Sequence, residues 1–336
     1  MRFALGLFIG VCSAALTSAQ PVVLSGPIDA FTFDGPTRSF RAVMGFPAGS
    51  SFGPALLTDL DAGSVAPRRN YAIAFQNGNC VFVSGLDSGR ALVAAVSGVA
   101  LQPESIVWSK DGSLAILFSR KASWFQTLTG FPNAPSAGPR LDVTVLRGSL
   151  ASIAADAKGQ RIAVGVSGPA GAVYWTSDWT SDRPSFVPLF SIADPIALEF
   201  SADGGMVYAL DGDAQRVTAA GLQNSSLRTF PSGLADPVAI LAVADTPTRE
   251  LLYIAGRSDQ LLRVFDVASQ QPLSDIPLAF KPTRMDPLGS NSFVLAARSE
   301  SAKPLWLLTW NPTPGAFFVP AIPVAPAGLR GVGGTE

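Results

Sequence analysis

The chemistry open to this chain is limited by a missing residue type, because the sequence contains no histidine. Without an imidazole, nucleophile systems of the Ser-His-Asp and Cys-His types are excluded. Zinc, copper and haem sites with histidine ligands are excluded for the same reason. We therefore assign no catalytic residue, cofactor or metal site from the sequence. Carboxylates, arginines and aromatic rings are the groups that remain.

Two aspartates stand at matching places in the chain, each immediately before a proline. They are Asp194, in an Ile-Ala-Asp-Pro segment, and Asp236, in a Leu-Ala-Asp-Pro segment. Aspartate is a common turn residue, and proline suits the start of a strand because it donates no ladder hydrogen bond. The alternative is that the two carboxylates bind a cation or another ligand.

Three arginines also recur at one place in the pattern. Arg120, Arg257 and Arg298 each follow an apolar segment that is typical of a short strand. Guanidinium groups gathered at one structural position could bind carboxylates or phosphates, because their forked donors match such anions. The alternative is that they are solvated loop tips paired with nearby acids such as Asp259 and Glu300.

One tryptophan lies in a polar segment rather than in an apolar one. Trp179 stands between Asp178 and Asp182, among threonines and serines. An indole exposed there would suit a partner or glycan surface, since its ring is apolar and its N–H is polar. The alternative is that the ring anchors the loop to the core.

The elements that must position these residues recur about every 40 to 47 residues. The clearest copies are residues 105–118 and 197–210, where an apolar strand runs into an Asp-Gly turn and a second apolar strand follows. A third and fourth strand complete each unit. This period with several short strands per unit predicts an all-β propeller of four-stranded blades.

The number of blades follows from the length of the repeating region. Dividing it by about 45 residues per unit favours seven blades, and six remain an alternative. The segment from Ala30 to Gly45 reads as a third and fourth strand, so the chain begins partway through a unit. We expect this incomplete blade to be supplemented by residues 55–58 or by the C-terminal segment.

Propeller geometry places the candidate residues on two faces. With strands numbered from the axis outward, the fourth-to-first and second-to-third connections share one face, and the remaining turns share the other. Asp194 and Asp236 are then near the channel mouth on the face that carries the arginines. Trp179 is predicted on the opposite face.

The two ends of the chain differ in composition from the repeats. Residues 1–19 have a short apolar run and a small-residue cleavage pattern, which predicts a signal peptide and a secreted or periplasmic protein. Residues 20–320 form the single propeller domain, and residues 321–336 form a Pro- and Gly-rich tail. Cys80 is then the only cysteine left, and we expect it to be buried and inert.

The overall charge argues against one class of partner. The formal net charge is −1, which does not favour nucleic acid. No second apolar stretch is long enough to span a membrane after signal cleavage. We expect a monomer.

The turn between the first two strands carries a resemblance to a known group. It reads Ser-Lys-Asp-Gly at residues 109–112 and Ser-Ala-Asp-Gly at residues 201–204. This pattern resembles that of bacterial secreted propellers built from WD-like and YVTN-type repeats, with the subfamily unassigned. The resemblance implies binding of a ligand or partner more often than one chemistry.

Two functions follow as hypotheses. The first is a propeller that binds an extracytoplasmic protein, peptide or glycan as a module or scaffold, without catalysis. The alternative is a hydrolase or lyase that depends on carboxylates or calcium, with its site at the mouth of the central channel.

Overall fold

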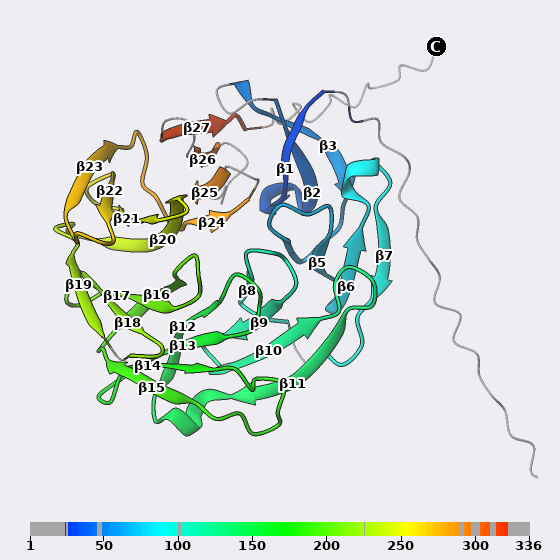
Figure 1. Ribbon diagram of the computed structural model, residues 1–336. Helices are drawn as coiled ribbons and strands as arrows, with labels where there is room; N and C mark the ends of the chain where they lie inside the picture. Colours follow the sequence, from blue (N-terminus) through cyan, green and yellow to red (C-terminus); the bar gives the residue numbers. More distant parts are fainter. Residues whose placement is uncertain are drawn as a thin grey trace, which may run out of the picture.

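The computed structural model describes the chain at residues 24, 26–45, 49–99, 102–224, 226–288, 292–296, 303–309 and 314–321. These residues form seven antiparallel sheets arranged as the blades of a propeller (Figure 1). The predicted all-β fold with seven blades is confirmed. The predicted signal peptide, Arg298 and all but the first residue of the tail lie outside the described residues. No helix within the described ranges has the length and apolar character needed to cross a membrane.

Within the described residues, each blade takes its strands from one continuous stretch of chain. Blades 1 to 3 contain β1 (Ile28–Asp34), β2 (Ser39–Met44), β3 (Ser51–Leu57); β4 (Ala62–Val65), β5 (Ala72–Gln76), β6 (Asn79–Ser84), β7 (Leu92–Ala95); and β8 (Ser105–Trp108), β9 (Ala115–Ser119), β10 (Trp124–Thr129), β11 (Ser136–Asp142). Blades 4 and 5 contain β12 (Ser149–Ala155), β13 (Ile162–Ser167), β14 (Ala172–Thr176), β15 (Val187–Ser191); and β16 (Pro195–Phe200), β17 (Met206–Asp211), β18 (Arg216–Gly221), β19 (Leu227–Pro231). Blades 6 and 7 contain β20 (Pro237–Thr246), β21 (Arg249–Gly256), β22 (Leu261–Asp266), β23 (Pro272–Pro277); and β24 (Asp286–Pro287), β25 (Ser292–Ala296), β26 (Leu305–Thr309), β27 (Gly315–Val319).

The repeated Ser-x-Asp-Gly turn has the same hydrogen bonds in both of its copies. In blade 3, Ser109 Oγ donates to Asp111 Oδ1 at 2.7 Å and accepts from the backbone N–H of Leu114 at 3.0 Å. In blade 5, Ser201 Oγ donates to Asp203 Oδ1 at 2.6 Å and accepts from the next strand in the same way. The glycine that follows each aspartate has a positive φ, which other residues rarely adopt. The motif is therefore a local device that starts each second strand.

The two faces of the ring can be assigned from contacts between loops. The fourth-to-first residue Glu104 accepts a hydrogen bond from the backbone N–H of Arg120 in a second-to-third loop. On the other side, Trp179 in a third-to-fourth loop donates to the carbonyl of Gln160 in a first-to-second turn. We call the first side the connection face and the second side the turn face. The predicted division of the loops is confirmed.

Blade 1 differs from the other six because it has three strands in the described residues. The β1–β2 turn contacts the β3–β4 connection, where Arg38 Nε donates to the Leu60 carbonyl at 2.8 Å. Asp61, in that connection, accepts from the backbone N–H of Gly78 on the connection face. These contacts make β1, β2 and β3 the second, third and fourth strands of the blade. The predicted assignment of the first hairpin as third and fourth strands is wrong by one position, and residues 55–57 belong to the added outermost strand.

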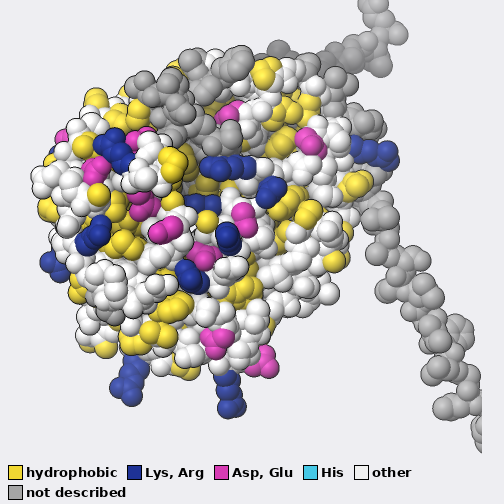
Figure 2. All heavy atoms as spheres, in the orientation of Figure 1, with side chains coloured by type: hydrophobic (Ala, Val, Ile, Leu, Met, Phe, Trp, Pro, Cys, Tyr) yellow, Lys and Arg dark blue, Asp and Glu magenta, His cyan; other side chains and the backbone are white. Residues whose placement is uncertain are grey.

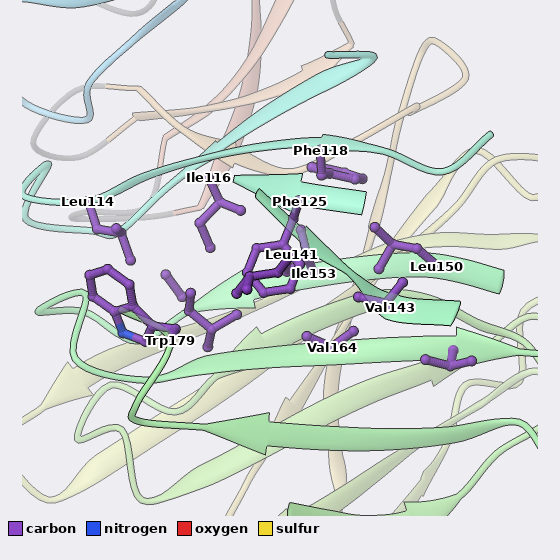
Figure 3. Packing of buried hydrophobic residues seen from close by; sticks show 13 residues of the cluster. Leu114, Ile116, Phe118, Phe125, Leu141, Val143, Leu150, Ile153, Val164 and Trp179 are labelled. Atoms are coloured by element: carbon purple, nitrogen blue, oxygen red, sulfur yellow. The ribbon is translucent and has the colours of Figure 1, made fainter. Parts of the chain in front are cut away.

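The core lies between the blades as a series of apolar layers. The layer between blades 3 and 4 is the largest and includes Phe125, Leu141 and Ile153 (Figure 3). The layer that closes the ring between blades 1 and 7 is smaller and includes Val43, Leu307 and Val319. Packing of one sheet face against the next therefore holds the ring together, since burial of apolar area is the main favourable term.

The remaining cysteine lies in one of these layers. Cys80 is 6% exposed and packs among apolar side chains of blades 2 and 3. Burial raises the pKa of its thiol to about 12, which keeps the thiol protonated at neutral pH. The prediction of a buried, unreactive cysteine is confirmed.

Candidate functional site

Three acidic residues occupy the same fourth-to-first position on the connection face, and the first is hydrogen-bonded within the blade that follows it. Glu104 accepts from the Ser119 hydroxyl at 2.7 Å and from the backbone N–H groups of Lys121 and Arg120 at 3.0 and 3.2 Å. The Ser119 hydrogen bond is the main cause that lowers the pKa of Glu104. Its carboxylate therefore caps the loop that follows β9.

At the second position, Asp236 is paired with one of the predicted arginines. Arg257 Nε lies 2.9 Å from Asp236 Oδ2, and Arg257 Nη2 lies 3.2 Å from Oδ1, so the guanidinium grips both oxygens. Ser258 donates to the same carboxylate. The hydrogen bond from Arg257 lowers the pKa of Asp236 below its usual range. Both side chains are substantially exposed, at 50% for Arg257 and 35% for Asp236.

At the third position, Asp194 faces other carboxylates instead of a cation. Burial raises the pKa of Asp194, and the negative charges of Asp213 and Asp211 raise it further. The carboxylate lies over Gly212, where a Cβ would come within 2.6 Å of Asp194 Oδ2. A side chain at position 212 would therefore make the Asp194 carboxylate shift. The same position in three blades thus has three different electrostatic environments.

The structure brings only some of the predicted connection-face residues together. Asp236 and Arg257 form one pair within blade 6, whereas Arg120 is exposed on blade 3 and its backbone amide serves Glu104. Arg298 lies outside the described residues. Among the residues that the structure describes, no group of three or more acidic or cysteine side chains is placed to hold a metal ion. Ligand binding by this set stays a prediction.

The Trp179 side chain is buried and does not lie on the surface. It is 8% exposed and belongs to the apolar layer between blades 3 and 4 (Figure 3). Its Nε1 donates to the carbonyl of Gln160 at 3.4 Å. The expected exposure of this indole is wrong, because the ring fills the end of the layer beside Leu114. It anchors its loop on the turn face, which was the alternative.

An ion pair on the turn face joins blade 3 to blade 5, and its lysine also contacts blade 6. Lys110, in the turn between β8 and β9, places its Nζ 2.5 Å from Glu199 Oε1 on β16. The same Nζ donates to the carbonyl of Ala242 on β20 at 3.1 Å. The strands β8, β16 and β20 are innermost strands around the centre of the ring (Figure 1). The lysine therefore connects blade 3 to blades 5 and 6 near that centre.

The Lys110–Glu199 pair is partly buried. The side chains of Lys110 and Glu199 are 27% and 16% exposed. Burial raises the pKa of Glu199, while the Lys110 charge and a hydrogen bond from the backbone N–H of Ala242 act in the opposite direction. Figure 2 shows basic and acidic side chains interspersed around the centre of one face of the ring. A buried carboxylate beside a specific cation in a channel is typical of functional sites.

One residue of this pair, Glu199, could have been recognised from the sequence, although composition and repeat spacing did not identify it. Glu199 interrupts the apolar run Ala197, Leu198 and Phe200 on an innermost strand. A charged residue at such a place has to be paired or to serve a function. Its partner could not be found in the same way, because Lys110 occupies the variable position of an ordinary turn 89 positions earlier in the chain.

The two candidate regions belong to opposite ends of the same innermost strand. Asp194 immediately precedes β16, and Glu199 is near its other end. Five residues of extended chain span about 16 Å, at about 3.3 Å per residue. One small ligand therefore cannot contact both carboxylates. The connection-face acids and the channel ion pair are separate sites.

Comparison with known proteins gives structural matches only. No protein-family model matches the chain, and no curated protein sequence does. The periplasmic gluconolactonase PpgL of Pseudomonas aeruginosa superposes with a TM-score of 0.59 at 19% identity, covering 88% of this chain and 96% of that one. A putative 6-phosphogluconolactonase of Bacteroides fragilis gives 0.60 at 11%, covering 88% and 95%. Hsv2 of Kluyvelomyces marxianus gives 0.55 at 12%, covering 85% and 93%. At these identities the matches show a common fold.

These matches also correct one expectation about function. The predicted non-catalytic binding or scaffold module is contradicted, because structural neighbours of this propeller are named as gluconolactonase and 6-phosphogluconolactonase enzymes. The alternative, a carboxylate-dependent hydrolase with its site at the channel, agrees better with them. Of the resemblance to secreted WD-like and YVTN-type propellers, the propeller fold is shown.

Proposed function

We propose that this protein hydrolyses a lactone, the cyclic ester of a hydroxy acid, at the turn-face end of its central channel. The observation that carries the proposal is the Lys110–Glu199 pair, which joins an ammonium and a partly buried carboxylate inside the ring. Ester hydrolysis needs a base to activate water and a positive group to stabilise the developing oxyanion. This pair supplies both groups at one place.

The reaction can be written with these two residues alone. The Glu199 carboxylate takes a proton from water as the water oxygen attacks the carbonyl carbon of the lactone. The Lys110 ammonium stabilises the resulting oxyanion. The ring C–O bond then breaks, and the leaving oxygen takes the proton from Glu199. The product is an open hydroxy acid, and both side chains return to their starting states.

Two further observations support this function. A partly buried ion pair contributes little to net stability, because desolvation of both charges offsets their attraction, so its presence inside the ring favours a functional role. The structural neighbours named gluconolactonase and 6-phosphogluconolactonase suggest sugar-derived lactones, with or without phosphate, as the first substrates to test. We also infer an extracytoplasmic location from the predicted signal peptide, with support from the periplasmic neighbour.

The test is proton release from a panel of sugar lactones, measured by pH-stat with the uncatalysed rate subtracted. We expect Glu199→Gln to lower kcat/KM by about 100-fold or more, the usual contribution of a general base. Asp236→Asn is the matched control, because it also removes one carboxylate from an ion pair and is expected to retain wild-type activity. Melting temperatures of both variants would confirm folding. Unchanged kcat/KM in Glu199→Gln, or no turnover by the wild-type protein, would overturn the proposal.

A further inference from the structure

A second glutamate lies close to the channel pair and is held by its own donors. Glu250, near the start of β21 in blade 6, accepts from the Tyr208 hydroxyl at 2.7 Å through Oε2. Its Oε1 accepts from the backbone N–H of Ala202 at 2.6 Å. Each carboxylate oxygen of Glu250 thus has a hydrogen-bond donor from blade 5.

Tyr208 connects this second glutamate to the first. On blade 5, Tyr208 of β17 is the direct cross-strand partner of Glu199 on β16. The Tyr208 side chain is fully buried, and burial together with the Glu250 charge raises its pKa. The phenol therefore stays protonated and donates its hydrogen to Glu250. This hydrogen bond joins the second carboxylate to the cross-strand neighbour of Glu199.

We propose that Tyr208 and Glu250 are positioning residues for Glu199, and that the fixed negative charge of Glu250 counteracts Lys110 and keeps Glu199 an effective proton acceptor. This inference rests on the proposed function. Lys110 alone would hold the Glu199 carboxylate in a tight ion pair and reduce its affinity for a proton. A nearby second carboxylate opposes that effect, so Glu199 binds the proton from water more strongly.

The groups around Glu199 come from four elements, and their effects can be separated. The Lys110 ammonium, from the β8–β9 turn, and the Ala242 amide, from β20, favour the ionised form of Glu199. The Glu250 charge, from β21, and burial favour the protonated form. Tyr208, from β17, acts through Glu250, and the charges of Arg228 and Asp203 lie near its phenol. Of the carboxylates named here, Glu250 is the one whose charge acts on Glu199.

The experiment is a carboxyl ¹³C NMR titration of glutamate-labelled protein without substrate. The chain has five glutamates, at positions 104, 199, 250, 300 and 336, so Glu199→Gln identifies the Glu199 signal. We expect Glu250→Gln to move the Glu199 midpoint to lower pH by about 0.5 to 1.5 units, the range for loss of one nearby charge. Glu250→Asp keeps the charge and should return the midpoint most of the way to the wild-type value.

Two variants separate positioning from a purely structural role. Asp245→Asn removes a carboxylate near the same β20–β21 turn and should leave the Glu199 midpoint unchanged. Tyr208→Phe keeps the buried ring but frees one oxygen of Glu250, so a smaller shift in the same direction is expected. This variant also provides a test if Glu250→Gln does not fold. A Glu199 midpoint that stays at the wild-type value in both Glu250→Gln and Tyr208→Phe, or in the folded one, would overturn the inference.

The outcome is independent of whether the chain proves to be a lactonase. A shifted midpoint with no turnover by the wild-type protein would support the positioning role and refute the proposed reaction. Loss of turnover in Glu199→Gln with an unchanged Glu199 midpoint in Glu250→Gln would support the proposed reaction and refute the positioning role. If both hold, the acid limb of the pH profile of kcat/KM should move to lower pH in Glu250→Gln by the same amount as the NMR midpoint.

Discussion

Two ion pairs in this propeller have short N–O distances, yet the pKa values of their carboxylates are shifted in opposite directions. Lys110 and Glu199 approach to 2.5 Å in the channel, and Arg257 and Asp236 approach to 2.9 Å on the connection face. The pKa of Asp236 is lowered by its arginine, whereas the pKa of Glu199 is raised in spite of its lysine. A short distance between opposite charges therefore does not predict how a carboxylate behaves.

The difference between the pairs comes from solvent. Asp236 remains 35% exposed, so water still stabilises its charge and the arginine adds to that stabilisation. Glu199 is 16% exposed and lies among apolar strands, so loss of water outweighs the lysine. In the exposed pair, the lowered pKa of Asp236 favours its ionised form. In the channel pair, burial raises the pKa of Glu199, which suits a group that accepts a proton.

The largest effect on stability is expected from breaking the channel pair on one side. Lys110→Met leaves Glu199 without its counter-charge, which should lower the free energy of unfolding by about 1–3 kcal/mol at pH 8. The pKa of Glu199 is then raised further, so this penalty arises as pH increases through that value and shrinks in acid. Urea unfolding at several pH values measures it. The double variant with Glu199→Gln should lose less than the two single variants added together, and strict additivity would contradict a direct pair.

A smaller effect is expected from the exposed pair. Asp236→Asn should change the free energy of unfolding by about 0.2–1 kcal/mol, with a weaker effect at high salt. Because the pKa of Asp236 is lowered in the folded state, its contribution is present above the pKa of an unfolded aspartate. The contribution disappears as pH falls through the lower folded value. Thermal melts of wild type and variant across pH 2 to 7 would detect this, and a salt-independent loss as large as that of Lys110→Met would remove the contrast between the pairs.

The smallest effect is expected at Asp194, whose carboxylate has no ion-pair partner among the residues that the structure describes. Asp194→Asn removes repulsion from Asp213 and Asp211, so a stabilisation of about 0.5 kcal/mol or less is expected at neutral pH. The raised pKa of Asp194 means that its ionised form costs stability, and this cost appears as pH rises through the folded value. The gain should therefore vanish in acid. A loss of stability at pH 7 would indicate that the carboxylate has a partner, such as a bound cation.

The predictions from sequence succeeded where the interactions are local. The Ser-x-Asp-Gly turn is built from a serine, an aspartate and a glycine within a few residues of one another, so its geometry follows from those residues alone. The regular spacing of such turns then predicts the number of blades. The first hairpin was misassigned because second, third and fourth strands share similar apolar patterns, and only contacts with blade 2 distinguish them.

The sequence by itself determined the repeat, the all-β propeller, the division of loops between two faces and the absence of histidine chemistry. The tertiary structure decided which charges meet. It placed Lys110 of blade 3 against Glu199 of blade 5, buried Trp179 between blades, and paired Asp236 but not Asp194 with a cation. Periodicity predicts the repeating unit and the number of blades, whereas electrostatics depends on distances and solvent exposure between blades. Those quantities arise only when the ring is assembled.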